Sequence, residues 1–136
     1  MRKIACLIFL SSLFVGVSAF AQDQDQKTPT PEETAAKEAD RLGTLLKLED
    51  WQIFYVDSTL QHDYTAYQED IKKLQSSKVD NYDIYTMTWD RWMDQIENTY
   101  RKIFTEAQWN AYLKAGAGKQ RKAREKRRAR MAGIKP

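Results

Sequence analysis

The residue types that carry most enzyme chemistry are scarce in this sequence. Its 136 residues include one histidine, His62, and one cysteine, Cys6. A structural zinc site needs about four strong ligands, and the helical neighbours of His62 at the four-residue spacing are Ser58 and Ala66. We therefore predict a surface histidine and no bound metal.

Nucleophilic catalysis and phosphate binding also lack support in the sequence. No base is placed to activate the serines after residue 21, and there is no glycine-rich phosphate-binding loop. Carboxylates are plentiful, but they lie opposite the apolar positions of the predicted helices, which indicates solvated helix faces. They include Asp57, Asp63, Glu69, Asp70, Asp90, Asp94 and Glu97. A glycosidase-like acid pair is the weaker alternative, and we predict no enzymatic activity and no cofactor.

Aromatic residues are more abundant than a small helical domain needs for its core. The chain has four tryptophans and seven tyrosines. One interpretation places them in the core, with tyrosine hydroxyls at its rim. In the other, some of them line an exposed concave surface that binds other proteins. The candidate client-binding residues are Trp51, Tyr55, Tyr85, Trp89, Trp92 and Trp109.

Charge is divided sharply along the chain. Residues 22–113 contain 10 Lys and Arg and 18 Asp and Glu, a net charge of −8, whereas residues 114–136 contain 10 Lys and Arg and one acid, a net charge of +9. Such a tail either binds lipid phosphates, lipopolysaccharide or nucleic acid, or balances the acidic body within one molecule or between subunits. Nucleic acid is the poorest partner for an exported protein. The candidate anion-binding residues are Lys119, Arg121, Lys122, Arg124, Lys126, Arg127, Arg128 and Arg130.

The N-terminus has the form of an export signal. Arg2 and Lys3 precede an apolar run over residues 4–17, and residues 19–21 have the small-x-small pattern of a signal peptidase site. The run is shorter than the ~20 residues that a membrane-spanning helix needs. We therefore predict a cleaved signal peptide over residues 1–21, which leaves a chain without cysteine. The expected location is the bacterial periplasm, with secretion as second choice.

The remaining chain predicts helices. Residues 22–29 are polar and unpatterned, as in a disordered leader. Thr30, Pro31 and Glu33 form a strong helix start. The helix extends to about Leu46, and its apolar face comprises Ala35, Ala39, Leu42 and Leu46, with Leu45 beside it.

A second helix is predicted from about Glu49 to Gln75, and a third ends near Phe104. The apolar seam of the second helix advances in steps of three and four residues: Ile53, Val56, Leu60, Tyr64, Tyr67, Ile71 and Leu74. The loop between the two helices covers residues 76–81. Because the helices are of similar length and the loop is short, we predict an antiparallel hairpin.

A capping box formed by Thr105 and Gln108 starts a fourth helix, with Trp109 and Tyr112 facing inward. The glycines near residue 116 predict a break. Beyond it, residues 116–136 form a basic C-terminal helix or tail, which we expect to be solvated and to stay apart from the core. The predicted fold class is all-α, a long antiparallel helical hairpin with two flanking helices, three to four helices in total. These helices form one domain over residues 30–115.

Two five-residue segments look like copies of one motif. Residues 48–52, LEDWQ, open the second predicted helix, and residues 104–108, FTEAQ, open the fourth. Both resemble the Leu-Thr-x-x-Gln motif of the Spy/CpxP-like periplasmic proteins of bacteria. Glu49 replaces threonine in the first copy, and Phe104 replaces leucine in the second. The matching motif and cap residues are Leu48, Gln52, Phe104, Thr105 and Gln108.

The resemblance implies a fold and a function. Spy/CpxP-like proteins are small, exported helical proteins in which a hairpin dimerises into a thin, curved cradle. Their best-known activity is the ATP-independent binding of unfolded or envelope-stressed proteins, while other members sense metal stress or repress a sensor kinase. We therefore expect a homodimeric periplasmic chaperone or envelope-stress protein. The alternative is an envelope adaptor or structural protein whose basic tail binds anionic lipid or a partner protein.

Overall fold

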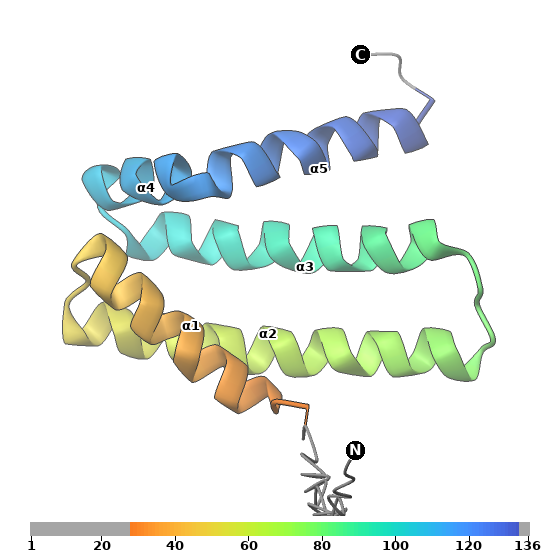
Figure 1. Cartoon of the computed structure of the whole chain (residues 1–136), viewed down its shortest axis with the longest axis horizontal. Helices are drawn as coiled ribbons and strands as arrows, with labels where there is room; N and C mark the ends of the chain where they lie inside the picture. Colours follow the sequence, from red (N-terminus) through yellow and green to blue (C-terminus); the bar gives the residue numbers. More distant parts are fainter. Residues whose placement is uncertain (1–27, 134–136) are drawn as a thin grey trace, which may run out of the picture.

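The described part of the chain, residues 28–133 of a computed structural model, contains helices and no strand (Figure 1). The predicted signal peptide, residues 22–27 of the predicted leader and residues 134–136 lie outside this range. The elements are α1 (Pro31–Leu46), α2 (Asp50–Ser76), α3 (Tyr82–Ile103), α4 (Glu106–Tyr112), a π-helical turn (Leu113–Ala117) and α5 (Gly118–Met131). The all-α prediction is confirmed.

Helices α2 and α3 form the predicted antiparallel hairpin (Figure 1). In the loop between them, Lys78 adopts a left-handed conformation with φ of 53°. Asn81 then caps α3, because its Oδ1 accepts a hydrogen bond from the backbone N–H of Asp83 at 2.9 Å. Helix α1 crosses the first half of α2, and the run from α4 to α5 returns along α3 (Figure 1).

Local hydrogen bonds define two of the helix starts. At α1, the Thr30 hydroxyl accepts from the Glu33 N–H at 3.2 Å, and the Glu33 carboxylate accepts from the Thr30 N–H at 2.9 Å. At α4, Thr105 and Gln108 make the same pair of bonds at 3.2 and 3.0 Å. Both predicted capping boxes are therefore confirmed.

The core lies at the end of the hairpin where α1, α2, α3 and α4 meet. It contains the predicted apolar face of α1 and the first half of the α2 seam, together with aromatic side chains of α3 and α4. Its buried apolar residues are Ala35, Ala39, Leu42, Leu46, Leu48, Val56, Leu60, Ile96, Tyr100, Phe104, Trp109 and Tyr112. Gly43 lets α1 approach α2 closely, since a Cβ there would lie 2.9 Å from Cδ1 of Ile53.

Helix α5 contributes no side chain to the apolar core, as predicted, but the prediction that the tail is solvated is wrong for its inner face. Helix α5 lies along α3, and the side chain of Arg124 is only 4% exposed. The predicted break at the glycines is confirmed. Gly116 adopts φ of 125°, which is not a helical conformation, so the helix is interrupted by a kink there before α5 begins. The tail packs through charged side chains instead of an apolar stripe, which is why apolar periodicity did not reveal its contact.

Candidate functional site

The two motif copies face each other through their glutamines. Gln52 Nε2 donates to Gln108 Oε1 at 2.7 Å, and Gln108 Nε2 donates to Gln52 Oε1 at 3.1 Å. Gln52 Nε2 also donates to the carbonyl of Ile103 at 3.0 Å, and Gln108 Nε2 to that of Lys47 at 3.5 Å. Each amide thus ties the start of its own helix to the chain that precedes the other motif.

The same oxygen atoms also cap the helices. Gln52 Oε1 accepts from the backbone N–H of Glu49 at 2.9 Å, as Gln108 Oε1 does from Thr105. Glu49 stands where the motif has threonine, and its carboxylate accepts from the indole N–H of Trp51 at 2.6 Å. All the hydrogen-bonding capacity of the two amides is used, which is the condition under which buried polar groups stabilise a fold.

A ladder of ion pairs joins α3 to α5. Arg127 binds Asp90 with two hydrogen bonds at 2.7 and 2.6 Å, and Arg124 Nε donates to Asp94 at 2.9 Å. Arg124 also donates to Glu97, and Arg128 donates to Asp94. As the residue number rises along α5 it falls along α3, so the two helices run antiparallel. The ladder neutralises acidic side chains of the body within one molecule.

The centre of the ladder is buried. The side chains of Glu97 and Arg124 are 3% and 4% exposed, and Tyr112 donates to Glu97 at 3.1 Å. Burial raises the pKa of the Glu97 carboxyl, and the guanidinium of Arg124 and the hydroxyl of Tyr112 offset only part of the rise. Glu97, Asp90 and Asp63 are all buried, so the prediction of solvated faces is wrong for these three carboxylates. Their arginine and glutamine partners come from other helices.

The sequence contained a signal for the ladder that apolar patterning does not detect. Asp90, Asp94 and Glu97 follow one another at steps of four and three residues, as do Arg121, Arg124 and Arg128 at steps of three and four. Two complementary charged faces on neighbouring helices indicate a contact between them.

The predicted client-binding aromatics do not form one surface. Trp109 is buried in the core, and the guanidinium groups of Arg101 and Arg121 lie over its ring, at 5.4 and 5.2 Å from the centroid. Trp92 donates its indole N–H to Asp70 at 3.0 Å, which lowers the pKa of that carboxyl, and Tyr85 donates its hydroxyl to the carbonyl of Val79 at 2.7 Å. These two rings are half-buried and hold the hairpin together.

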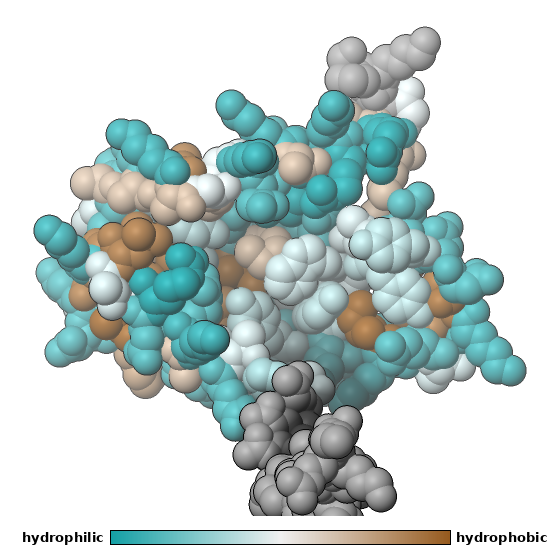
Figure 2. Space-filling view, in the orientation of Figure 1, coloured by the Kyte–Doolittle hydropathy of each residue, from teal (hydrophilic) through white to brown (hydrophobic). Residues whose placement is uncertain are grey.

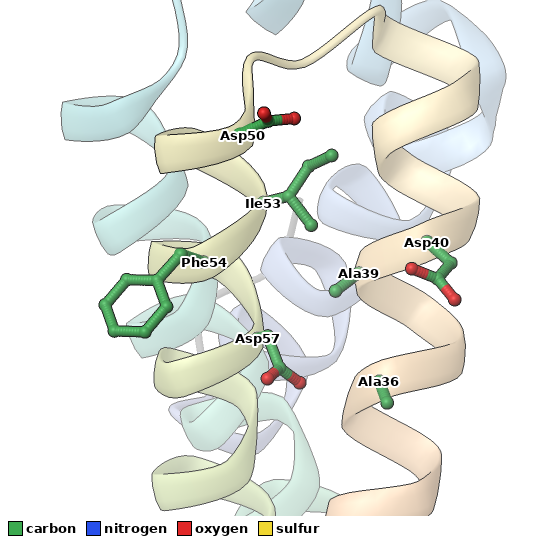
Figure 3. A pocket seen from close by; sticks show the side chains of 7 residues that line it. All are labelled: Ala36, Ala39, Asp40, Asp50, Ile53, Phe54 and Asp57. Atoms are coloured by element: carbon green, nitrogen blue, oxygen red, sulfur yellow. The ribbon is translucent and has the colours of Figure 1, made fainter.

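Trp51 and Tyr55, near the start of α2, are exposed. Together with Phe54 they form what we name the aromatic cluster: Trp51 is 51% exposed, Phe54 66% and Tyr55 55%. Tyr55 contacts both neighbours edge-on, at ring-centroid distances of 6.2 and 5.8 Å. Phe54 points away from α1 (Figure 3). The list of candidate residues from the sequence omitted Phe54, although its position off the α2 seam indicated that it would lie outside the core.

Trp89 separates two shallow grooves. It is 38% exposed and packs edge-on against Tyr67 at 5.1 Å. One groove of about 460 Å³ lies among α1, α3 and the π-helical turn, and the other, of about 250 Å³, lies beside the start of α1. On the face shown in Figure 2, hydrophilic side chains crowd over α5, while pale and brown ones lie across the hairpin.

A third hollow, of about 330 Å³, lies between α1 and α2 (Figure 3). Its walls carry the carboxylates of Asp40, Asp50 and Asp57. Asp57 Oδ2 accepts from Gln61 at 2.8 Å, while its Oδ1 is buried and has no hydrogen-bond partner among residues 28–133. No group of three or more His, Cys, Asp or Glu in the described range is placed to hold a metal ion. His62 is exposed, as predicted, and contacts Asp63 at 2.8 Å.

Within residues 28–133, no helix has the length and apolar character needed to cross a membrane. No protein-family model, no curated protein and no solved structure matches the chain.

Proposed function

We propose that the protein is an exported, non-enzymatic helical binding protein that holds apolar segments of unfolded or envelope proteins without ATP. The observation that carries this proposal is the aromatic cluster, which leaves three large rings side by side and half or more exposed on a small helical domain. Exposed apolar patches of this kind mark sites of protein interaction. Aromatic rings suit them because they offer large contact areas at low entropic cost.

One further feature supports the proposal. The two motif copies that resemble those of Spy/CpxP-like proteins lie against each other through Gln52 and Gln108. Tyr82, Ile84 and Met87, at the start of α3, expose apolar surface at the far end of the hairpin and serve as the comparison surface in the test below. A homodimer, as the resemblance implies, would add the cluster of a second chain to the surface open to a client.

The test is suppression of aggregation, followed by light scattering of a reduced test protein. Residues 22–136 would be added as wild type, as Trp51→Ser/Phe54→Ser/Tyr55→Ser and as Tyr82→Ser/Ile84→Ser/Met87→Ser. The second variant removes exposed apolar surface of similar kind from the other end of the hairpin. We expect the cluster variant to lose most of the suppression and the second variant to keep it. Equal activity in all three proteins would refute the proposal.

Deleting the tail is a poor substitute for these variants. Removal of residues 119–136 would strip Glu97, Asp90 and Asp94 of their arginine partners. A loss of aggregation suppression would then reflect destabilisation of the helical body and not the loss of a binding surface. The serine variants leave the ladder intact, so they test the surface alone.

A further inference from the structure

Helix α5 separates its basic residues by face. Four arginines face α3 and bind its carboxylates: Arg121, Arg124, Arg127 and Arg128. Four other cations follow one another at steps of three, four and four residues: Lys119, Lys122, Lys126 and Arg130. We name this second set the lysine face. At 3.6 residues per turn, its centre lies about 170° around the helix from that of the arginines.

The two faces differ in how their charge is used. The four arginines are paired with the three carboxylates Asp90, Asp94 and Glu97, which leaves a net charge of one on that face. The four residues of the lysine face are exposed, and none has a carboxylate within 4.0 Å in the part of the chain that the structure describes. The lysine face therefore presents four uncompensated positive charges along about 16 Å of helix.

The position and shape of this face restrict what it can bind. Helix α5 lies at the edge of the molecule with α3 on one side (Figure 1). Because the lysine face is opposite the arginines that bind α3, it points away from the body. A shallow notch of about 290 Å³ is lined by Lys126 and Arg130 of this face together with Ala123 and Arg127. No large apolar side chain interrupts the face, so it lacks the buried anchors on which tight protein–protein contacts depend. It also lacks the aromatic rings on which single-stranded nucleic acids stack.

We propose that the lysine face docks the protein on an anionic lipid surface by contacting the phosphates of the headgroups. Lysine ammonium groups are flexible point charges that suit a fluid array of phosphates better than one rigid ligand. Clusters of four or more basic residues on a helix are the usual basis of such binding. The acidic body, which such a surface repels, would face away from it. This proposal goes beyond client binding and does not depend on it.

The experiment measures the partition of residues 22–136, which include every described helix, onto vesicles. Vesicles of phosphatidylcholine with 30% phosphatidylglycerol would be compared with pure phosphatidylcholine by co-sedimentation. The lysine-face variant is Lys119→Gln/Lys122→Gln/Lys126→Gln/Arg130→Gln. The matched control is Lys37→Gln/Lys72→Gln/Lys78→Gln/Lys102→Gln, which removes the same charge from exposed positions of the body. Circular dichroism would verify that both variants keep the helical content of the wild type.

We expect wild type and control to bind the anionic vesicles, and the pure phosphatidylcholine vesicles to bind neither. Each cation near a lipid surface contributes about a fivefold gain in partition, so the lysine-face variant should lose binding by on the order of several hundredfold. High salt should release the wild type, because screening acts over ~3 Å at 1 M. The proposal is overturned if wild type does not bind, if the lysine-face variant binds as well as the control, or if heparin binds the lysine face while vesicles do not.

Discussion

The side-chain amides of Gln52 and Gln108 are bonded to each other in both directions, at 2.7 and 3.1 Å, across 56 residues of sequence. Each glutamine also closes the start of its own helix. The pair therefore converts two local caps into one long-range contact that sets α4 against the start of α2. The pair stabilises the fold only while both amides keep all of their hydrogen bonds. A buried amide that lacks some of its partners costs more free energy than an apolar side chain in its place.

Replacing either glutamine should destabilise the protein. Gln52→Leu removes both bonds between the two amides and the donor to the carbonyl of Ile103, at a cost of about 2–4 kcal/mol in unfolding free energy. Urea denaturation of both single variants and the double variant would measure the coupling, for which we expect about 0.5–3 kcal/mol. Gln75→Leu, at an exposed position, is the control. Strictly additive costs would contradict the direct bond.

Arg124 should matter more than any other cation of the tail. Arg124→Ala leaves Glu97 buried without its main partner, and breaking a buried pair in this way costs about 3–5 kcal/mol. Arg128→Ala, at a residue that is 60% exposed, should cost no more than about 1 kcal/mol. Chemical denaturation would compare the two variants. Equal costs would show that Glu97 and Arg124 do not depend on each other in the folded state.

The same variant should respond to pH. Burial raises the pKa of Glu97 above that of the unfolded chain, and losing Arg124 should raise it further. The unfolded state then binds fewer protons than the folded state between these two pKa values, so stability falls as pH rises through this range. The destabilisation by Arg124→Ala should therefore be larger at pH 7 than at pH 4. In the double variant Glu97→Gln/Arg124→Ala, which has no carboxyl group at position 97, the destabilisation should be the same at pH 7 and pH 4.

Buried tyrosines predict alkaline unfolding. Burial raises the pKa of Tyr64 to about 12 and also raises the pKa of Tyr100 and Tyr112. Above pH 10, the unfolded chain releases phenolic protons that the folded chain retains, so the unfolding free energy decreases as pH rises. Tyr100→Phe should reduce this slope by about 1.4 kcal/mol per pH unit, which denaturation of wild type and variant at several alkaline pH values would measure. Because wild type and variant carry the same lysines, the difference between their unfolding free energies at each pH does not contain the contribution of lysine titration.

Gly116 should resist substitution although it has room around it. An alanine Cβ there would contact nothing within 4 Å, yet φ of 125° is strained for any residue with a side chain. Gly116→Ala should cost about 1–3 kcal/mol in thermal or urea unfolding. Lys114→Ala, also exposed and two residues away, should be nearly neutral. A neutral Gly116→Ala would mean that the bend between α4 and α5 is not required.

The sequence by itself determined the helices and where they begin and end. Caps such as Thr30 with Glu33 and Thr105 with Gln108 form between residues three apart, and apolar periodicity identifies the inward face of α1. Both kinds of interaction are local, so they can be recognised before the chain is folded. The hairpin followed from the lengths of two helices and of the loop between them.

Only the tertiary structure decided which of these faces meet. The pairing of Gln52 with Gln108, the burial of Glu97 against Arg124 and the exposure of the aromatic cluster depend on the relative placement of helices far apart in the chain. A charged helix without an apolar stripe is usually solvated, and α5 differs because α3 offers it a matching row of carboxylates. Whether a charge meets water or an opposite charge is a property of the assembled fold, which no local pattern contains.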